Sequence, residues 1–263
     1  MDTDKDIQKW VGQLNPISLD EMSGIKLMNR TDTKFVTSKE RLVQLLALAQ
    51  GKYYAQQIDG LRIANYKTTY WDTPTHRFYT EHHNGRAPRQ KVRVRTYVDS
   101  DLTFLEVKTK NNHGLTKKKR ITVETQDRAS LVQADGDNFI QGLTGFTTAD
   151  IMPTVQNQFQ RITLVNYAKT ERLTIDFNVQ FHNLETGRES GTGDLVIIEL
   201  KRDGNVFSPI LSILRQLRIK PSGFSKYCIG SAMTNLNLKR NLFKPKLVKL
   251  SKLTGYDFRA SSR

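Results

Sequence analysis

The sequence predicts a closed β-barrel with a charged interior, and three observations lead to this expectation. Five segments alternate charged and apolar residues with the period of two that is typical of strands. Their polar positions hold mostly Arg and Lys with an occasional carboxylate, whereas an ordinary solvent-facing strand surface carries Thr, Ser, Gln and mixed charge. The chain also has a formal net charge of +15, which indicates a polyanionic partner.

The composition indicates a folded protein of one large or two small domains. The chain has 263 residues, of which 37% are hydrophobic, and it contains nine Tyr, twelve Phe and two Trp. The single cysteine, Cys228, excludes an internal disulfide and a cysteine-based zinc cluster, and it is typical of a reducing, cytoplasmic location. No stretch approaches the roughly 18 apolar residues of a membrane helix, and the first residues do not form a secretory signal.

Strands and helices can be placed from this patterning and from capping residues. Strands are expected at 29–36, 63–71, 90–97, 102–109, 115–123, 154–165, 172–181 and 194–201. Helices are expected at 18–28, 37–51, 128–140, 208–217 and from about 225 onwards. Ser18 with Glu21 and Thr37 with Glu40 have the spacing of capping boxes.

The strand at 90–97 shows the alternation most clearly, because Lys91, Arg93 and Arg95 share one face. Four further strands place charged pairs on one face: Glu106 and Lys108, Lys118 and Arg120, Arg172 and Asp176, and Glu199 and Lys201. An ordinary sheet with one wet face is the alternative explanation. However, like charges on neighbouring strands repel each other, so an inward-facing arrangement around a run of phosphates explains the pattern better.

The few carboxylates on these faces favour a metal ion that is bound together with phosphate. Asp32, Glu106, Glu124, Asp176 and Glu199 are too few to cancel the basic charge. A hard cation such as Mg²⁺ or Mn²⁺ needs only one or two carboxylates when phosphate oxygens supply other ligands. The sequence therefore favours a metal that bridges substrate and protein.

Eight stretches occur in the order of a known family. They are Arg30–Phe35, Thr69–Asp72, Arg93–Arg95, Leu105–Thr109, Gly114–Arg120, Arg172–Asp176, Ile198–Lys201 and Gly223–Tyr227. Over about residues 25–235, the chain resembles the polyphosphate polymerase domain of the vacuolar transporter chaperone (VTC) family, within the triphosphate tunnel metalloenzyme superfamily. The resemblance implies an α+β fold in which a closed antiparallel barrel of about eight strands has helices packed outside.

The resemblance also implies an activity and a set of site residues. The activity is transfer of the terminal phosphate of ATP to a growing polyphosphate chain, with release of ADP and a need for Mn²⁺ or Mg²⁺. The residues expected to contact phosphate during catalysis are Lys34, Arg93, Arg95, Lys108, Lys118, Arg120, Arg172 and Lys226. Further substrate-binding residues are Arg30, Arg161, Lys201 and Ser225. Glu199 is the expected metal ligand, and Asp32, Glu106 and Asp176 are either second ligands or partners that orient the basic residues.

Two alternatives to the polymerase remain. The first is a hydrolase of tripolyphosphate or nucleoside triphosphates, although hydrolytic members begin with Glu-x-Glu-x-Lys where this chain has Arg30, Asp32 and Lys34. The second is a non-catalytic polyanion binder. Nucleic acid is not expected as a partner, because aliphatic rather than aromatic residues alternate with the basic ones.

The ends of the chain lead to two further expectations. Residues 236–263 hold eight Lys or Arg and one acid, Asp257, so they are expected to form a basic C-terminal tail after a single domain at 1–235. A solvated tail is the main interpretation, and peripheral contact with a membrane is the alternative. The chain has neither the membrane segment nor the extra N-terminal domain of the eukaryotic complexes, which favours a bacterial form.

Overall fold

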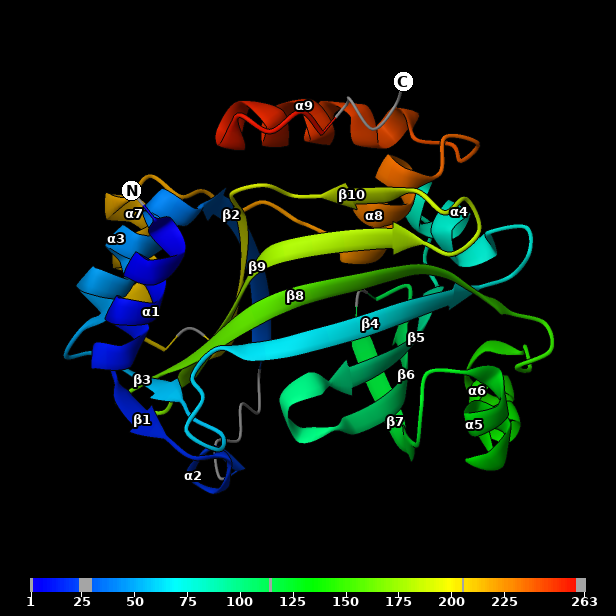
Figure 1. Cartoon of the computed structure of the whole chain (residues 1–263), viewed down its shortest axis with the longest axis horizontal. Coiled ribbons are helices and arrows are strands. Elements are labelled where there is room, and N and C mark those ends of the chain that lie inside the picture. Colours follow the sequence, from blue (N-terminus) through cyan, green and yellow to red (C-terminus); the bar gives the residue numbers. More distant parts are fainter. Residues whose placement is uncertain (1, 24–29, 114, 205, 259–263) are drawn as a thin grey trace.

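The fold is built on one strongly curved antiparallel sheet with helices packed against it (Figure 1). The computed structural model describes residues 2–23, 30–113, 115–204 and 206–258. The main strands follow the spatial order β2-β11-β9-β8-β4-β5-β6-β7. They are β2 (Arg30–Ser38), β4 (Ala64–Asp72), β5 (Arg89–Tyr97), β6 (Leu102–Lys110), β7 (Thr116–Val123), β8 (Met152–Asn166), β9 (Glu171–Asn183) and β11 (Leu195–Asp203). Three short strands extend this sheet: β1 (Asn15–Ile17), β3 (Tyr53–Gln56) and β10 (Glu189–Gly191).

The helices cover the sheet in groups (Figure 1). They are α1 (Thr3–Gln13), α2 (Leu19–Ser23), α3 (Lys39–Ala49), α4 (Arg77–His83), α5 (Arg128–Gln133), α6 (Gly136–Thr144), α7 (Pro209–Gln216), α8 (Lys226–Thr234) and α9 (Lys244–Thr254). Helices α1, α3 and α7 gather at one end of the sheet, whereas α5 and α6 lie at the other. Among the described helices, none is both long enough and apolar enough to cross a membrane.

The alternation predicted from sequence is present in the folded sheet. On β11, Val196, Ile198 and Leu200 are buried in the core that α1, α3 and α7 complete. Glu199 and Lys201 point to the opposite, concave face and form an ion pair there. The apolar residues therefore hold the helices, and the charged residues lie inside the curve of the sheet.

The closed barrel expected from sequence is not what the structure shows. Among the described residues, no ladder joins β2 to β7, so the sheet has two ends. The free edge of β2 is covered instead by the segment before α8: Ser222 N–H donates to the Lys34 carbonyl at 2.8 Å, and Phe35 forms an isolated bridge with Pro221. Backbone groups on the edge of β2, which a closed barrel would pair with another strand, bind this loop instead.

The local predictions differ from the structure at several helices. Ser18 and Glu21 form their capping box, but helix α2 is described only to Ser23, and the rest of the expected helix lies outside the described residues. The cap of α3 is Ser38, whose hydroxyl accepts the Arg41 N–H, rather than Thr37. The expected helix at 128–140 is two helices, α5 and α6. Helices α1 and α4 were not predicted.

The predicted basic tail is folded over most of its length. Helix α9 buries Leu247 and Leu250 in the same core as α4 and α8, and Phe258 is buried after the helix ends. The described part of 236–263 is therefore packed against the sheet rather than solvated.

Candidate functional site

Both ends of the sheet contribute side chains to one cavity of about 410 Å³. Its lining residues are Asp32 and Lys34 from β2, Glu199 from β11, Arg89 and Lys91 from β5, Lys108 and Lys110 from β6, Thr116 from β7, His82 from α4, Gly223 to Ser225, Cys228 and Ile229 around the start of α8, and Phe243 and Lys246 near α9. The strands β2 and β7 are the two ends of the sheet and do not pair with each other. Both contribute to the lining, so the cavity lies between these two ends.

The cavity is strongly cationic. Six of its described lining residues are Lys or Arg, and two, Asp32 and Glu199, are carboxylates. Two lysines are held by the loop before α8: Lys34 Nζ donates to the Phe224 carbonyl at 3.3 Å, and Lys91 Nζ donates to Ser225 Oγ at 3.0 Å. Both acceptors are neutral, so these two hydrogen bonds do not offset the positive charge of either ammonium group.

Glu106 organises the cations on β5, β6 and β7. Its side chain is 1% exposed, and it pairs with Arg93 through Nη2 at 2.6 Å and with Lys118 Nζ at 2.8 Å. Burial alone would raise the pKa of Glu106, but Arg93, Arg95 and Lys118 outweigh burial and hold that pKa well below its usual range. Glu106 is therefore ionised and fully occupied as a partner of basic groups.

Asp176 has the same role on β9. Arg161 donates to it through Nε at 2.5 Å and Nη2 at 2.8 Å, and Lys226 at the start of α8 forms a second ion pair. The Lys226 ammonium also lies 3.9 Å from the centre of the Phe159 ring. Asp176 thus orients two cations that face the interior of the sheet, and it has little capacity left for a metal ion.

Glu199 and Asp32 are the carboxylates that line the cavity. Glu199 forms an ion pair with Lys201, with 2.9 Å between Glu199 Oε2 and Lys201 Nζ. Burial would raise the pKa of Glu199, but Lys34 and Lys201 outweigh it and hold the pKa at about 2. In the described ranges, no three His, Cys, Asp or Glu side chains form a metal-binding group by themselves. These two carboxylates are ligands of the type that a hard cation takes together with phosphate oxygens and water.

The other predicted residues lie on the same concave face but deeper or further along it. Arg95 Nε donates to Thr68 Oγ1 at 3.2 Å, and the Arg120 guanidinium lies 4.3 Å from the centre of the Phe104 ring. Arg172 pairs in register with Lys201, and Lys118 and Arg120 share a face as expected. Arg30 begins β2, but its side chain lies outside the described residues.

Sequence comparison adds a decisive observation to this geometry. The model of the VTC domain family matches residues 29–235, which is most of the chain. The chain belongs to the VTC domain family. No curated protein is similar enough in sequence to count as a relative.

Solved structures share the fold of this VTC domain at low sequence identity. An adenylyl cyclase candidate from Hippeastrum, described as having a dominant triphosphatase activity, is 16% identical with a TM-score of 0.51 over 78% of this chain and 96% of that chain. An adenylate cyclase candidate from Bacillus halodurans is 14% identical with a TM-score of 0.49 over 75% of this chain and 96% of that chain. The first likeness shows that the two chains have a common fold.

The VTC domain has site residues that the sequence did not single out. Lys91 lines the cavity, and the strand alternation could have indicated this, because Lys91 shares the face of Arg93 and Arg95. Lys110 follows Lys108 by two residues and gave the same signal. His82 and Lys246 lie on α4 and α9, and no strand alternation could have indicated them.

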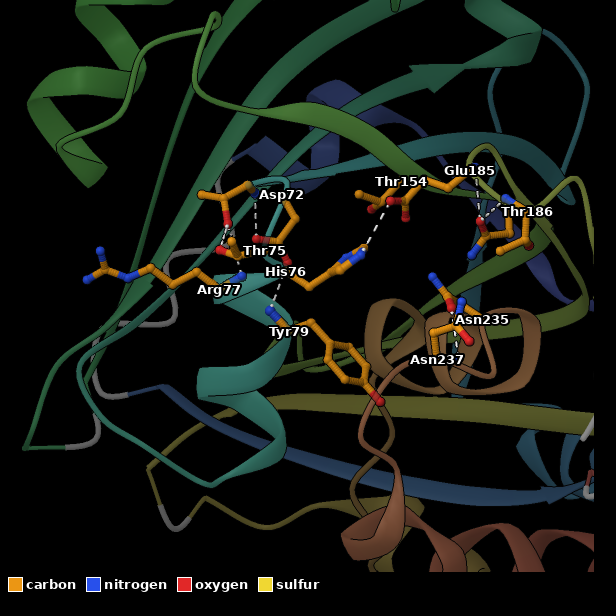
Figure 2. A network of polar contacts seen from close by, with 12 residues as sticks. Asp72, Thr75, His76, Arg77, Tyr79, Thr154, Glu185, Thr186, Asn235 and Asn237 are labelled. Atoms are coloured by element: carbon orange, nitrogen blue, oxygen red, sulfur yellow. Dashed lines mark hydrogen bonds and ion pairs between the residues drawn. The ribbon is translucent and has the colours of Figure 1, made fainter.

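Asp72 holds the start of α8 in place, and Figure 2 shows the part of its polar network that reaches Tyr79 on α4. Asp72 ends β4 and accepts the Phe78 and Tyr79 N–H groups of α4 at 2.9 Å each, together with the Tyr227 hydroxyl of α8. Tyr227 directly follows Lys226 in the chain. Asp72 therefore acts as a positioning residue, because it ties the helix that carries Lys226 to the sheet.

The depressed pKa values of three interior lysines predict that phosphate binding depends on pH. Burial lowers the pKa of Lys226 to about 7, with Asp176 opposing and Arg161 adding to this effect. Burial likewise lowers the pKa of Lys91 and of Lys108 to about 8. These ammonium groups are charged below these values and lose their charge as the pH rises through them. We therefore expect affinity for inorganic triphosphate to fall as the pH rises from about 6 to about 9.

Isothermal titration of metal-free protein with triphosphate checks this expectation. Triphosphate itself becomes more negative over the same range, which alone would strengthen binding, so a decline reports on the protein. Lys226→Arg is the matched control, because a guanidinium stays charged throughout. This variant should lose the part of the decline near pH 7. Affinity that rises with pH in the unsubstituted protein would contradict the assignment of the lysines to phosphate.

Proposed function

We propose that this VTC domain transfers the terminal phosphate of ATP to the end of a polyphosphate chain, releasing ADP, with a divalent metal ion as cofactor. The observation that carries the proposal is the cavity, in which six basic side chains face two carboxylates. A ligand with several closely spaced negative charges balances such a surface, as a chain of phosphates does. Membership of the VTC domain family supports the same substrate class.

Positioning and charge stabilisation supply most of the catalysis in this proposal, as is general for phosphoryl transfer. Lys34, Lys91 and Lys108 hold phosphate oxygens as point charges, and Arg93, oriented by Glu106, offers two donors to one phosphate. A bound Mg²⁺ or Mn²⁺ would neutralise charge on the transferred group, and Glu199 and Asp32, which line the cavity, would hold it.

The nucleophile in this proposal comes from the substrate. An oxygen of the terminal phosphate of the chain forms a bond to the γ-phosphorus of ATP while the bond between that phosphorus and the β–γ bridging oxygen breaks. This oxygen is already ionised at neutral pH, so the reaction requires no catalytic Ser or His. The cavity residues need only hold the two phosphate chains in line.

Product analysis tests the proposal. Pure protein is incubated with ATP and Mn²⁺ or Mg²⁺, and products are separated by gel and treated with a polyphosphatase. Polymer that the polyphosphatase removes, formed together with ADP, is the expected result. ATP that remains unchanged under all metal conditions would leave only a non-catalytic polyanion binder.

A hydrolase on the same fold is the second candidate, and the triphosphatase activity described for the Hippeastrum protein favours it. Against it stands the single carboxylate Asp32 in the first strand, where hydrolytic members have two glutamates. The same incubation separates the two candidates, because a hydrolase releases orthophosphate and leaves no polymer.

A further inference from the structure

Two residues beyond the part of the chain that matches the VTC family line the same cavity. The family match ends at residue 235, whereas Phe243 and Lys246 belong to the segment that follows it. Residues that follow the matched part of the chain thus form part of the cavity wall. These residues can take part in binding only if contacts with the rest of the fold hold them in place.

Helix α4 anchors the start of the added segment. Tyr79 Oη donates to the Lys239 carbonyl at 2.9 Å, and the Leu242 N–H donates to His83 Nε2 at 3.3 Å. The Phe243 ring meets the His83 ring edge to face with 5.1 Å between their centres. Residues 239–243 are therefore fixed to a helix that is itself part of the cavity wall.

The far end of α9 is fixed as well. Leu247 and Leu250 are buried in the core, and Phe258 is 1% exposed. Tyr256 packs so closely on Gly193 that a Cβ at that glycine would lie 2.9 Å from the Tyr256 Cβ. Helix α9 is thus held at both ends, so the direction of its side chains is defined.

Lys246 points from this fixed helix toward the loop that opens α8. Its Nζ lies 3.9 Å from the position that a Cβ on Gly223 would take. None of the ion pairs among the described residues involves Lys246. The charged groups that act on its ammonium group include two further cations, Lys249 and Lys34. Burial, together with these cations, lowers the pKa of Lys246. A half-buried ammonium group that has no carboxylate partner in these ion pairs leaves its positive charge available to an anion in the cavity.

His82 indicates the strength of the positive field at this rim. Its Nδ1 is buried and has no hydrogen-bond partner. Burial first, and then Lys91, Arg89, Lys246 and Lys34, lower the pKa of His82 to about 2. The imidazole is therefore neutral although it lines the cavity, because burial first, and its cationic neighbours in addition, disfavour a positive charge on the ring.

We propose that Lys246 binds a phosphate group at the outer end of the polyphosphate chain, so that α9 extends the phosphate-binding path beyond the VTC family domain. The inference rests on the proposed function in one respect, namely that the cavity takes a linear chain of phosphates. It adds that chains longer than triphosphate gain a contact that triphosphate lacks.

Binding measurements with two ligands test this inference. Dissociation constants for inorganic triphosphate and for a longer linear polyphosphate are measured without metal for the unsubstituted protein, for Lys246→Ala and for Lys252→Ala. Lys252 lies on the same helix but is exposed and does not line the cavity, so it is the matched control. Thermal unfolding of each variant shows that the fold is retained.

We expect Lys246→Ala to weaken binding of the longer chain by about three- to tenfold, the range of one partly screened charge-assisted contact. Binding of triphosphate should change by less than about twofold, and Lys252→Ala should change neither ligand by more than that. Equal losses for both ligands, or no loss for the longer chain, would overturn the inference. If the unsubstituted protein binds neither ligand, the proposed function fails instead, so the two failures are distinguishable.

Discussion

Glu199→Gln should lower metal-dependent turnover by about 100-fold or more, corresponding to at least about 2.7 kcal/mol of lost transition-state stabilisation. Glutamine has nearly the size of glutamate and still accepts a hydrogen bond from Lys201, so the cavity keeps its shape. What it removes is a negative charge that is present at neutral pH, since Lys34 and Lys201 hold the pKa of Glu199 at about 2 against the effect of burial. Triphosphate binding without metal should stay the same or become tighter, because a carboxylate that repels phosphate is gone.

Initial rates measured over a range of Mn²⁺ or Mg²⁺ concentrations check this prediction. Glu189→Gln is the control, because the Glu189 side chain is 80% exposed on β10 and distant from the cavity lining. The same dependence of rate on metal concentration in Glu199→Gln and in the unsubstituted protein would exclude Glu199 as a metal ligand.

The charged face of each strand could be predicted from sequence because strand alternation is a local property. Lys91, Arg93 and Arg95 are two residues apart, so they must share a face wherever the strand lies. Lys118 and Arg120 are likewise two residues apart, and the contact of Lys118 with Glu106 agrees with the predicted face. The face on which each of these strand cations lies was therefore predictable from sequence, whereas Lys246 on α9 was not.

The closure of the sheet and the division of labour among the carboxylates depend on contacts between distant segments. Whether β2 pairs with β7 was decided by the loop at Pro221 and Ser222, which no strand pattern describes. Glu106 and Asp176 became partners of arginine because the register places them opposite Arg93 and Arg161. Sequence parity places a carboxylate on a face but does not say which basic residue lies opposite it.

The C-terminal segment shows how a local signal can be hidden by composition. Leu247 and Leu250 are three residues apart and share one face of a helix, which is the spacing of a packed helix. The lysines around them dominate the average hydropathy, so the segment had the composition of a tail. Its burial depends on the core surface that α4 and α8 provide.

Glu106→Gln should lower the free energy of unfolding by about 3–5 kcal/mol, the usual cost of removing one partner from a buried ion pair. Glu106 is 1% exposed and is the carboxylate that Arg93 and Lys118 share. Without its charge, these two cations and Arg95 repel one another in a poorly solvated region. Phosphate can replace the missing negative charge, so saturating triphosphate should stabilise Glu106→Gln more than it stabilises the unsubstituted protein.

Urea unfolding monitored by circular dichroism, with and without triphosphate, measures both effects. Glu81→Gln is the control: Glu81 pairs with Arg77 across one turn of α4 at 2.9 Å, and because the Arg77 side chain is 59% exposed we expect a loss below about 1 kcal/mol. Equal stabilisation of Glu106→Gln and the unsubstituted protein by triphosphate would contradict the idea that phosphate and Glu106 neutralise the same cations. The comparison with Glu199→Gln is informative in itself. The Glu199 side chain is 21% exposed, so that variant should lose less stability than Glu106→Gln, and its main loss should be turnover. Such a separation would assign the two carboxylates to different tasks on one concave surface, with Glu199 toward the metal ion and Glu106 toward the arginines.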